Sequence, residues 1–446
     1  MVPGIRRFHA PGFTGFQRLL PVIRRAPSGT DDPDVTGEDS SSTQGGSDDG
    51  AVPCLDTVSD SPISTTGSTT GSTPGVTLPE SIKPADGRFG CGPSKVRPEQ
   101  IDAIVAAASS VMGTSHRKPQ VKNVVGSIRS GLTSLFGLPD DWEIVLGNGG
   151  TTVFWDAATF GLVSNRSQHL VFGEFSSKFA EACAAAPHLG DPTVIQSATG
   201  DHPTAVGEPG VDLYALTHNE TSTGVAMQLT RPADADPGAL VAVDATSGAG
   251  GLRWSPDEVD VYYFAPQKCF AADGGLWIAA CSPAAVDRIE RIAASDRWCP
   301  ASIDLGIALT NSKADQTYNT PAVATVLMLD TQVQWMIGKG GLEWCASRCD
   351  ASAAAMYGWA ETRDWASPFV TNPLKRSSVV ATIDLDDSID ANQVSAILRK
   401  NGILDTDSYR KLGRNQLRVG MFPAIDPADV EALTVCIDRV VESLQN

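Results

Sequence analysis

The chain has 446 residues, of which 41% are hydrophobic, and its formal net charge at pH 7 is −18. This length predicts two packed domains with additional chain, and the hydrophobic share is large enough for sizeable cores. The acidic charge disfavours nucleic acid and anionic lipid as partners. The sequence also contains no run of eighteen apolar residues, so no membrane span is predicted.

Residues 1–79 differ in composition from the rest of the chain. An arginine-rich start without acids is followed by an acidic stretch and then by an uncharged stretch of Ser, Thr, Gly and Pro. Apolar residues are too sparse there to offset the entropy of ordering, so we predict a disordered N-terminal extension. An organelle transit peptide is the alternative for the arginine-rich start.

From residue 80 onward, short apolar runs rich in β-formers alternate with helical stretches. Pro98–Met112 has apolar residues at helical spacing. The predicted strands are WEIVLG from Trp142, HLVFG from His169, LVAVDA from Leu240 and VYYF from Val261. This alternation predicts an α/β fold with a mostly parallel sheet, in a large domain over residues 80–335. Ligands of such sheets bind beyond the carboxyl ends of the strands.

The last hundred residues predict a smaller C-terminal α+β domain, over residues 336–446. Its expected strands are VVATIDLDD and NQLRVGMF, and its expected helices cover residues 391–401 and the segment from Pro427. The nine cysteines of the chain are scattered and form no CxxC pair. No zinc site is therefore predicted, and reduced thiols together with the lack of a secretory signal indicate the cytoplasm.

The strongest chemical signal is the pair Asp244 and Lys268. Asp244 ends one apolar strand and Lys268 follows the next, with a loop of small residues after the acid. Pyridoxal phosphate (PLP) chemistry needs such a pair: a lysine amine that holds the cofactor, and a carboxylate that keeps the pyridine nitrogen protonated. The alternatives are a helix-capping Asp244 and a solvated Lys268. The pairing favours the cofactor interpretation, with Lys268 as the catalytic residue.

A second signal is the glycine-rich segment LGNGGTTVFWD from Leu146, which predicts a turn between a strand and a helix. The free N–H groups of a helix start and the hydroxyls of Thr151 and Thr152 suit a phosphate group. An ordinary capped turn is the alternative.

These segments resemble fold-type I PLP-dependent aminotransferases, and in detail the phosphoserine aminotransferase family in its actinobacterial form. The similarity extends from residue 80 to about residue 444. It rests on RFGCGPSKVRPEQ, GTSHRKPQVKN, LGNGGTTVFWD, HNETSTGV, DQTYNTPAVAT and YRKLGRNQLRVGMFP. Three departures stand out: no arginine follows the glycines of LGNGG, Phe175 stands where many relatives have tryptophan, and Tyr409 replaces a histidine that is common in relatives.

The resemblance implies a set of cofactor contacts. Thr151 and Thr152 are expected at the cofactor phosphate, and Phe175 is expected to stack on the pyridine ring. Thr221 is expected at the phenolic oxygen, and Gln267 at the phosphate or the ring. The resemblance also implies a homodimer, in which Asn319 and Thr320 reach the PLP phosphate of the neighbouring subunit.

The resemblance further implies how anionic substrates are held. Arg418 is expected to bind the α-carboxylate in a bidentate manner. His116 and Arg117 are expected at the distal anionic group, with Arg410 as a helper. No metal is expected.

The implied reaction transfers the amino group of L-glutamate to 3-phosphohydroxypyruvate, giving O-phospho-L-serine and 2-oxoglutarate in serine biosynthesis. A related substrate, 4-phosphohydroxythreonine of vitamin B6 biosynthesis, is compatible with the same site. The alternatives are another fold-type I enzyme, such as a serine or alanine–glyoxylate aminotransferase or a cysteine desulfurase, or a non-catalytic PLP-binding protein. A nucleotide-dependent dehydrogenase is disfavoured, because no suitable GxGxxG motif follows a strand.

Overall fold

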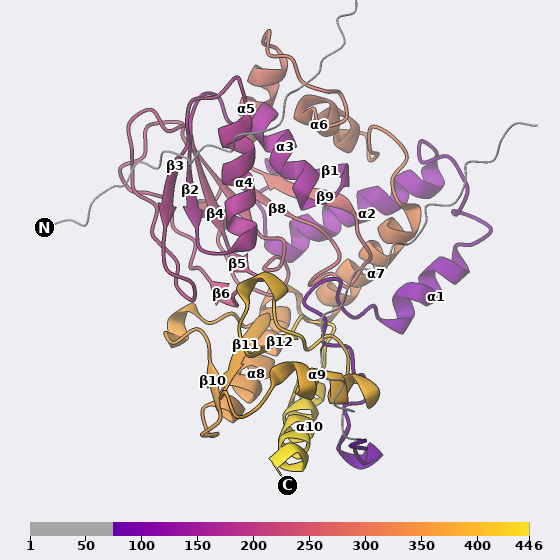
Figure 1. The fold of residues 1–446 in the computed structure, drawn as a ribbon. Coiled ribbons are helices and arrows are strands. Elements are labelled where there is room, and N and C mark those ends of the chain that lie inside the picture. The colour runs from indigo at the N-terminus through magenta and orange to yellow at the C-terminus, as the bar shows by residue number, and fades with distance from the viewer. Residues whose placement is uncertain (1–74, 446) are drawn as a thin grey trace, which may run out of the picture. The chain divides into compact units, whose positions relative to one another are not determined.

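The largest sheet among the described residues has seven strands (Figure 1). The computed structural model describes residues 75–445. The strands follow the order β1-β9-β8-β7-β4-β2-β3, and all neighbouring pairs are parallel except those that include β9. Their bounds are β1 Glu143–Gly149, β2 Ser167–Val171, β3 Thr193–Gln196, β4 Leu213–Thr217, β7 Leu240–Asp244, β8 Val261–Phe264 and β9 Gly275–Cys281. The expected mostly parallel α/β sheet is therefore confirmed.

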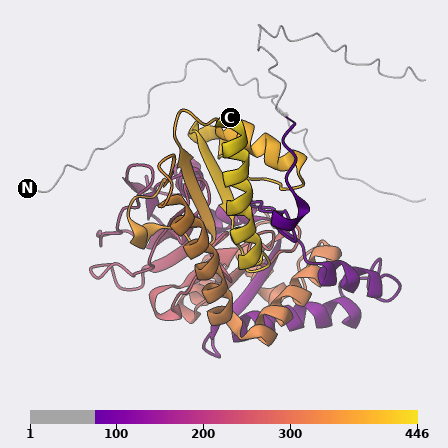
Figure 2. The ribbon, with the colours of Figure 1, turned by 90° about the horizontal axis from the view of Figure 1, so that it is seen from below.

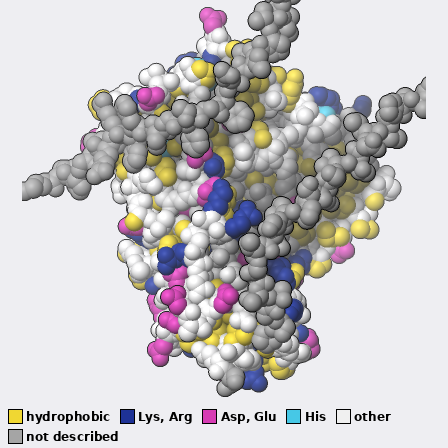
Figure 3. Space-filling view, in the orientation of Figure 1, with side chains coloured by type: hydrophobic (Ala, Val, Ile, Leu, Met, Phe, Trp, Pro, Cys, Tyr) yellow, Lys and Arg dark blue, Asp and Glu magenta, His cyan; other side chains and the backbone are white. Residues whose placement is uncertain are grey.

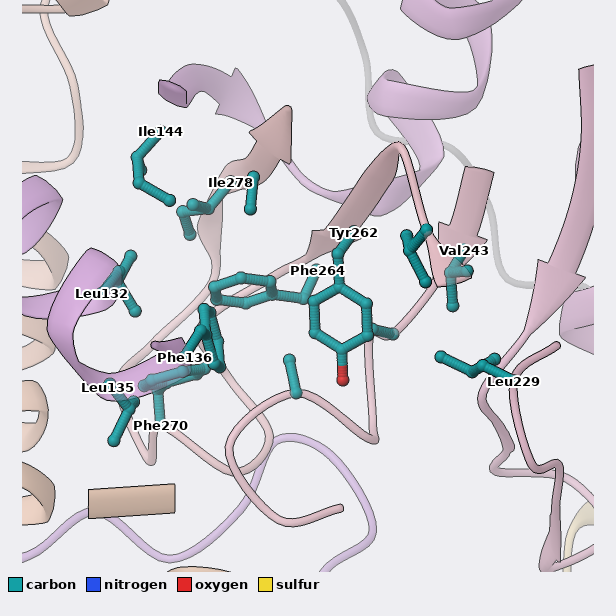
Figure 4. Packing of buried hydrophobic residues seen from close by; sticks show 14 of the residues in the cluster. Leu132, Leu135, Phe136, Ile144, Leu229, Val243, Tyr262, Phe264, Phe270 and Ile278 are labelled. Carbon is teal, nitrogen blue, oxygen red and sulfur yellow. The ribbon is translucent and has the colours of Figure 1, made fainter. Parts of the chain in front are cut away.

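Alternate residues of each strand enter two separate cores, because successive side chains point to opposite faces of a sheet. On one face Tyr262 and Phe264 pack with the helices α2 (Pro119–Phe136) and α7 (Val323–Lys339). Figure 4 shows Phe136 of α2 against Phe264 and Phe270, and edge contacts between these rings have centroid distances of 5.9 and 6.4 Å.

On the opposite face, Val261 and Tyr263 belong to the core made with four helices. These helices are α3 (Thr151–Gly161), α4 (Glu174–Ala185), α5 (Pro283–Ala293) and α6 (Leu305–Lys313). Phe154 of α3 stacks on Tyr263 with the ring centroids 4.3 Å apart. Helices on both faces of the mostly parallel sheet bury its central strands β4, β7 and β8 completely, which explains why their sequences are nearly continuous apolar runs, whereas the edge strand β3 is partly exposed.

A second sheet of three antiparallel strands has its own core. Its strands are β10 (Ala366–Pro368), β11 (Val380–Leu385) and β12 (Gln416–Gly420). Helices α8 (Gly341–Ala360), α9 (Ala391–Lys400) and α10 (Pro427–Gln445) contribute to that core, and Figure 2 shows α8 and α10 beside this sheet. None of the helices between residues 75 and 445 combines the length and apolar character needed to cross a bilayer.

The remaining elements are short. They are the helix α1 (Pro98–Ala106), the two-residue strands β5 (Asn219–Glu220) and β6 (Val225–Ala226), and single 3-10 turns at Glu80–Ile82, Pro256–Glu258, Pro373–Lys375 and Arg410–Leu412. The helix expected over Pro98–Met112 ends early and continues as hydrogen-bonded turns. Ser109 and Ser110 lie in these turns, three and four residues after the last helical residue, Ala106, and serine favours turns over helix interiors.

The N-terminal extension predicted for residues 1–79 lies outside the described residues up to residue 74. The described part of it packs on the second core, where Leu78 is only 1% exposed and its N–H donates to Asn401 Oδ1 at 2.8 Å. Leu78 is thus part of the second core. The helix α7 continues past residue 335, and the division between a large and a small domain stays a prediction.

Candidate active site

Two ionisable side chains lie buried at the carboxyl ends of the adjacent strands β7 and β8. Asp244 is the last residue of β7, and Lys268 lies in the turn that follows β8. Asp244 is 5% exposed and Lys268 is 7% exposed. Charged groups are rarely buried to this extent without a function or a partner, so the two residues mark a candidate site.

The carboxylate of Asp244 is held by three donors. The backbone N–H and hydroxyl of Thr246 donate to Oδ1 at 2.9 and 2.6 Å, and the indole N–H of Trp155 donates to Oδ2 at 3.1 Å. Burial raises the pKa of Asp244 to about 6, and the hydrogen bonds from Thr246 and Trp155 act in the opposite direction. The carboxylate therefore has a fixed orientation, and it would be stabilised further by a cation placed beside it.

The amine of Lys268 lies in a narrow space beside the backbone of Cys91 and Gly92. Its Nζ donates to the backbone oxygen of Cys91 at 2.8 Å. Gly92 has φ +126°, a backbone conformation that favours glycine, and an added Cβ at this position would lie 2.3 Å from Lys268 Cε. Burial lowers the pKa of Lys268 to about 8. An amine with such a pKa can both accept and donate a proton near neutral pH.

This pKa predicts how the stability of the cofactor-free protein depends on pH. Because the pKa of Lys268 is lower in the folded state than its ordinary value of 10.5, the unfolded chain binds more protons between pH 8 and 10.5. The free energy of unfolding should therefore rise with pH across this window, by up to about 3 kcal/mol from this group.

Urea unfolding of wild-type and Lys268→Met protein between pH 7 and 10.5 checks this effect. The variant should be the more stable protein at pH 7, and its advantage should shrink as the pH rises. A constant difference between the two proteins would contradict a buried amine with a lowered pKa.

An aromatic and a guanidinium group face this amine. Lys268 Nζ lies 5.7 Å from the ring centroid of Phe175, at the start of α4. Phe175 contacts Tyr409, with the centroids 6.0 Å apart, and the guanidinium carbon of Arg418 lies 5.2 Å from the Tyr409 centroid. Arg418 on β12 thus reaches from the second sheet toward the strand ends of the first.

Thr221 connects to both sheets. Its hydroxyl donates to Ser247 Oγ at 2.8 Å, and its backbone oxygen accepts from Arg418 Nη1 at 3.2 Å. Among the residues that the structure describes, Arg418 Nε and Gln267 Oε1 are buried without a hydrogen-bond partner. Buried polar atoms in this state have unused capacity for a bound molecule.

The glycine-rich segment has the predicted form. Strand β1 ends at Gly149, Gly150 is the N-cap residue, and α3 begins at Thr151. Thr151 Oγ1 lies 2.8 Å from Thr246 Oγ1, which connects the helix start to Asp244. Thr151 is buried, whereas Thr152 is exposed, so the two hydroxyls have different surroundings.

A second cluster brings together His116, Arg117, Asn319 and Thr320. Thr320 Oγ1 lies 3.2 Å from His116 Nδ1, and Arg117 Nη2 donates to the backbone oxygen of Tyr318 at 3.1 Å. The side-chain amide of Asn148 donates to Asn319 Oδ1 and to the backbone oxygens of Asn319 and Thr320. Across residues 75–445, no hydrogen bond joins this cluster to the side chains of Lys268 or Asp244.

The two arginines that were predicted at the distal anionic group are exposed. Arg117 and Arg410 lie at the surface, and Arg410 begins the 3-10 turn Arg410–Leu412. Figure 3 shows Lys and Arg side chains near the middle of the face in view, although the chain as a whole is acidic. Burial and the charge of Arg117 lower the pKa of His116, whose Nε2 is buried without a partner in the described part of the chain.

Several residues that contact the site were not predicted. The side chains of Trp155, Thr246, Ser247 and Glu220 and the backbone oxygen of Cys91 all touch predicted site residues. Trp155 could have been inferred, because it lies one helical turn after Thr151 on α3. Thr246 could also have been inferred, because the two-residue spacing from Asp244 suits a turn in which an Asp side chain accepts from the backbone.

Comparison with known proteins identifies the family. Residues 89–406 match the aminotransferase class-V family. A phosphoserine aminotransferase of Rhodococcus opacus (strain B4) is 60% identical over 367 residues, which cover 82% of this chain and 98% of that protein. A phosphoserine aminotransferase of Corynebacterium glutamicum (strain R) is 61% identical over 366 residues, which cover 82% and 97% of the two chains.

Solved structures agree on the fold. A phosphoserine aminotransferase from Cytophaga hutchinsonii superposes with a TM-score of 0.73 at 21% identity, covering 79% of this chain and 99% of that one. A phosphoserine aminotransferase from Bacillus circulans subsp. alkalophilus gives 0.70 at 19% identity, covering 80% and 99%. The match to the family profile and the identity over most of the chain lead to one conclusion: the chain belongs to the aminotransferase class-V family.

Proposed function

We propose that this chain is a PLP-dependent phosphoserine aminotransferase, which transfers the amino group of L-glutamate to 3-phosphohydroxypyruvate in serine biosynthesis. The observation that carries the proposal is the buried pair of Lys268 and Asp244 at adjacent strand ends, with Arg418 on the side of the second sheet. The relatives that are about 60% identical over nearly their full length support the choice of substrates.

The residues present fit the proposed cofactor. Asp244 offers an oriented carboxylate for a protonated ring nitrogen, and Phe175 offers a ring face near Lys268. The N-terminus of α3, with the hydroxyls of Thr151 and Thr246, suits the phosphate. Gln267 Oε1 and Thr221 are further candidate contacts. When bound, PLP supplies the electron sink that stabilises negative charge on the substrate Cα.

The chain's own residues then perform three tasks. Arg418 binds the α-carboxylate that glutamate and 3-phosphohydroxypyruvate share, using Nε, which has no hydrogen-bond partner within residues 75–445. Lys268, with a pKa of about 8, accepts the proton from the Cα of glutamate in the first half-reaction and donates a proton to the Cα of the product in the second. Phe175 and Tyr409 cover the amine and the guanidinium with aromatic surface, which restricts water near both groups.

The distal phosphate or γ-carboxylate of the substrates is assigned to His116 and Arg117, with Arg410 as a helper. A homodimer is part of the proposal, because Asn319 and Thr320 are exposed in the single chain and belong to the same cluster as His116. If Thr320 reaches the neighbouring subunit's cofactor, His116 and Arg117 belong to that subunit's active site as well, because they lie in the same cluster as Thr320. We further propose 4-phosphohydroxythreonine as a second substrate and a cytoplasmic location, since the cysteines of residues 75–445 are all unpaired.

One spectroscopic experiment tests the reaction. Purified protein loaded with PLP should lose its yellow absorbance on addition of L-glutamate and regain it on addition of 3-phosphohydroxypyruvate. Unphosphorylated hydroxypyruvate should restore the band much more slowly, because it lacks the anion that Arg117 would bind. Arg117→Ala should narrow this difference. A wild-type preference for hydroxypyruvate or glyoxylate would exclude a phosphoserine aminotransferase. The protein would then be a class-V aminotransferase with a different substrate.

Subunit mixing tests the proposed contact across the dimer. Co-expressed Lys268→Ala and Asn319→Ala/Thr320→Ala subunits should form heterodimers with one complete site and one doubly defective site. Such heterodimers should show about half of the wild-type activity, because the complete site takes its Lys268 and its Asn319–Thr320 from different subunits.

The measurement is the activity of heterodimers isolated with two affinity tags. Both parent homodimers serve as controls. Heterodimer activity no higher than that of the Asn319→Ala/Thr320→Ala parent would mean that both groups act within one subunit.

A further inference from the structure

Glu220 is a fully buried acid that the proposed mechanism does not use. It is 0% exposed and ends the short strand β5, directly before Thr221. Its Oε2 accepts from the backbone N–H groups of Phe175 and Ser176 at 3.1 and 2.8 Å. Its Oε1 accepts from the N–H and hydroxyl of Ser222 at 3.1 and 2.7 Å. A buried carboxylate is tolerated where donors replace the lost water in this way.

The donors at Phe175 and Ser176 are free N–H groups at the start of α4. Such groups have no partner within the helix and are usually bound by the side chain of the N-cap residue. The N-cap residue here is Gly173, which has no side chain. A Cβ at Gly173 would lie 2.3 Å from Glu220 Cγ and 2.4 Å from Glu220 Cδ. The carboxylate of Glu220 thus fills the place of the missing cap, where the helix dipole also favours negative charge.

Three residues of the candidate site depend on this arrangement. The amide of Phe175 is bound by Glu220 itself. Thr221 follows Glu220 in the chain, and its backbone oxygen accepts from Arg418. One carboxylate therefore fixes the spacing between the aromatic ring beside Lys268, the Thr221 hydroxyl and the Arg418 guanidinium.

We propose that Glu220 is a positioning residue that caps α4 from outside the helix and thereby holds Phe175, Thr221 and Arg418 in register around the cofactor and the substrate carboxylate. The part that concerns the cofactor and substrate rests on the proposed function. The cap itself does not, so the two can be tested separately.

Hydrogen exchange of the cofactor-free protein tests the cap. Glu220→Gln keeps the shape of the side chain but removes its charge and one acceptor oxygen. The amides of Phe175 and Ser176 should then exchange at least about tenfold faster, as expected when charge-assisted hydrogen bonds are lost. The control is Glu181→Gln on the same helix, whose side chain is 60% exposed and pairs with Lys178. Unchanged exchange at these two amides in Glu220→Gln would overturn the proposal.

Cofactor and substrate binding test the positioning role. In Glu220→Gln the dissociation constant of PLP, titrated by fluorescence, should rise roughly tenfold, and KM for glutamate should rise more than kcat falls, because Phe175 and Arg418 lose their fixed positions. Glu220→Asp should recover part of both effects. If the wild type does not bind PLP, the proposed function fails, and the hydrogen-exchange experiment still shows whether Glu220 caps α4. If the wild type binds PLP and Glu220→Gln binds it equally well, only the positioning role fails.

A serine at Gly173, the N-cap position, gives a further test. Its effect on PLP binding should have opposite signs in the wild type and in Glu220→Ala. Gly173→Ser in the wild type should weaken PLP binding, because its Cβ collides with Glu220. In Glu220→Ala the clash with Glu220 is removed, and Ser222 Oγ, which would lie 2.7 Å from the added Cβ, can rotate away because it no longer donates to Glu220. The new hydroxyl can then accept from the start of α4 as an ordinary N-cap. The same substitution should therefore strengthen PLP binding in that background by about fivefold. If Gly173→Ser weakened PLP binding equally in both backgrounds, Glu220 would not act as the N-cap of α4.

Discussion

Replacement of Lys268 by alanine is expected to abolish transamination, with a loss of roughly 10⁴-fold or more in kcat. Lys268 is the buried amine beside Phe175, and its pKa of about 8 suits a group that accepts and returns one proton in each half-reaction. Lys268→Arg should be almost as inactive, because a guanidinium stays protonated and cannot act as a base. Steady-state assays and single-turnover spectra with glutamate measure both effects.

The matched control for this prediction is Lys178→Ala. Lys178 is a half-exposed lysine on α4 that pairs with Glu181, and its removal should leave kcat within a factor of about two. Borohydride reduction of the loaded wild type should also place the label on Lys268. Near-normal turnover in Lys268→Ala would refute the aminotransferase mechanism altogether.

The second large effect is expected for Arg418→Lys. The guanidinium of Arg418 lies against Tyr409, and within residues 75–445 it donates one side-chain hydrogen bond, from Nη1 to the backbone oxygen of Thr221. Its Nε has no partner there, so the remaining donors can bind a carboxylate at two points. Lysine keeps the charge but loses the bidentate geometry. We expect a loss of about 2–4 kcal/mol in kcat/KM, and it should be similar for glutamate and 3-phosphohydroxypyruvate because both have the α-carboxylate.

Arg414→Lys is the matched control for Arg418. Arg414 precedes the same strand and pairs with Asp384 at a half-exposed site, so its replacement should change kcat/KM very little. An Arg418→Lys variant that is impaired with 3-phosphohydroxypyruvate but normal with glutamate would move Arg418 from the shared α-carboxylate to the distal phosphate.

The sequence was informative where local pattern and chemistry coincide. The apolar runs that became β1, β2, β7 and β8 are continuous because these strands are buried on both faces. The acid and the lysine were recognisable because each follows such a run. The strands β4 and β9 were not predicted, and β9 runs antiparallel to both neighbours, which no pattern within GLWIAAC specifies.

The α/β class, the pair of Asp244 and Lys268 and the glycine-rich start of α3 could be predicted from the sequence, because these features depend on spacing within one or two adjacent elements. Which distant groups meet could be read only from the folded chain. Burial sets the pKa of Lys268, Arg418 arrives from a separate sheet, and Glu220 caps a helix that begins 46 residues earlier in the chain. Such contacts join residues far apart in sequence, and their burial and geometry exist only after the chain has folded.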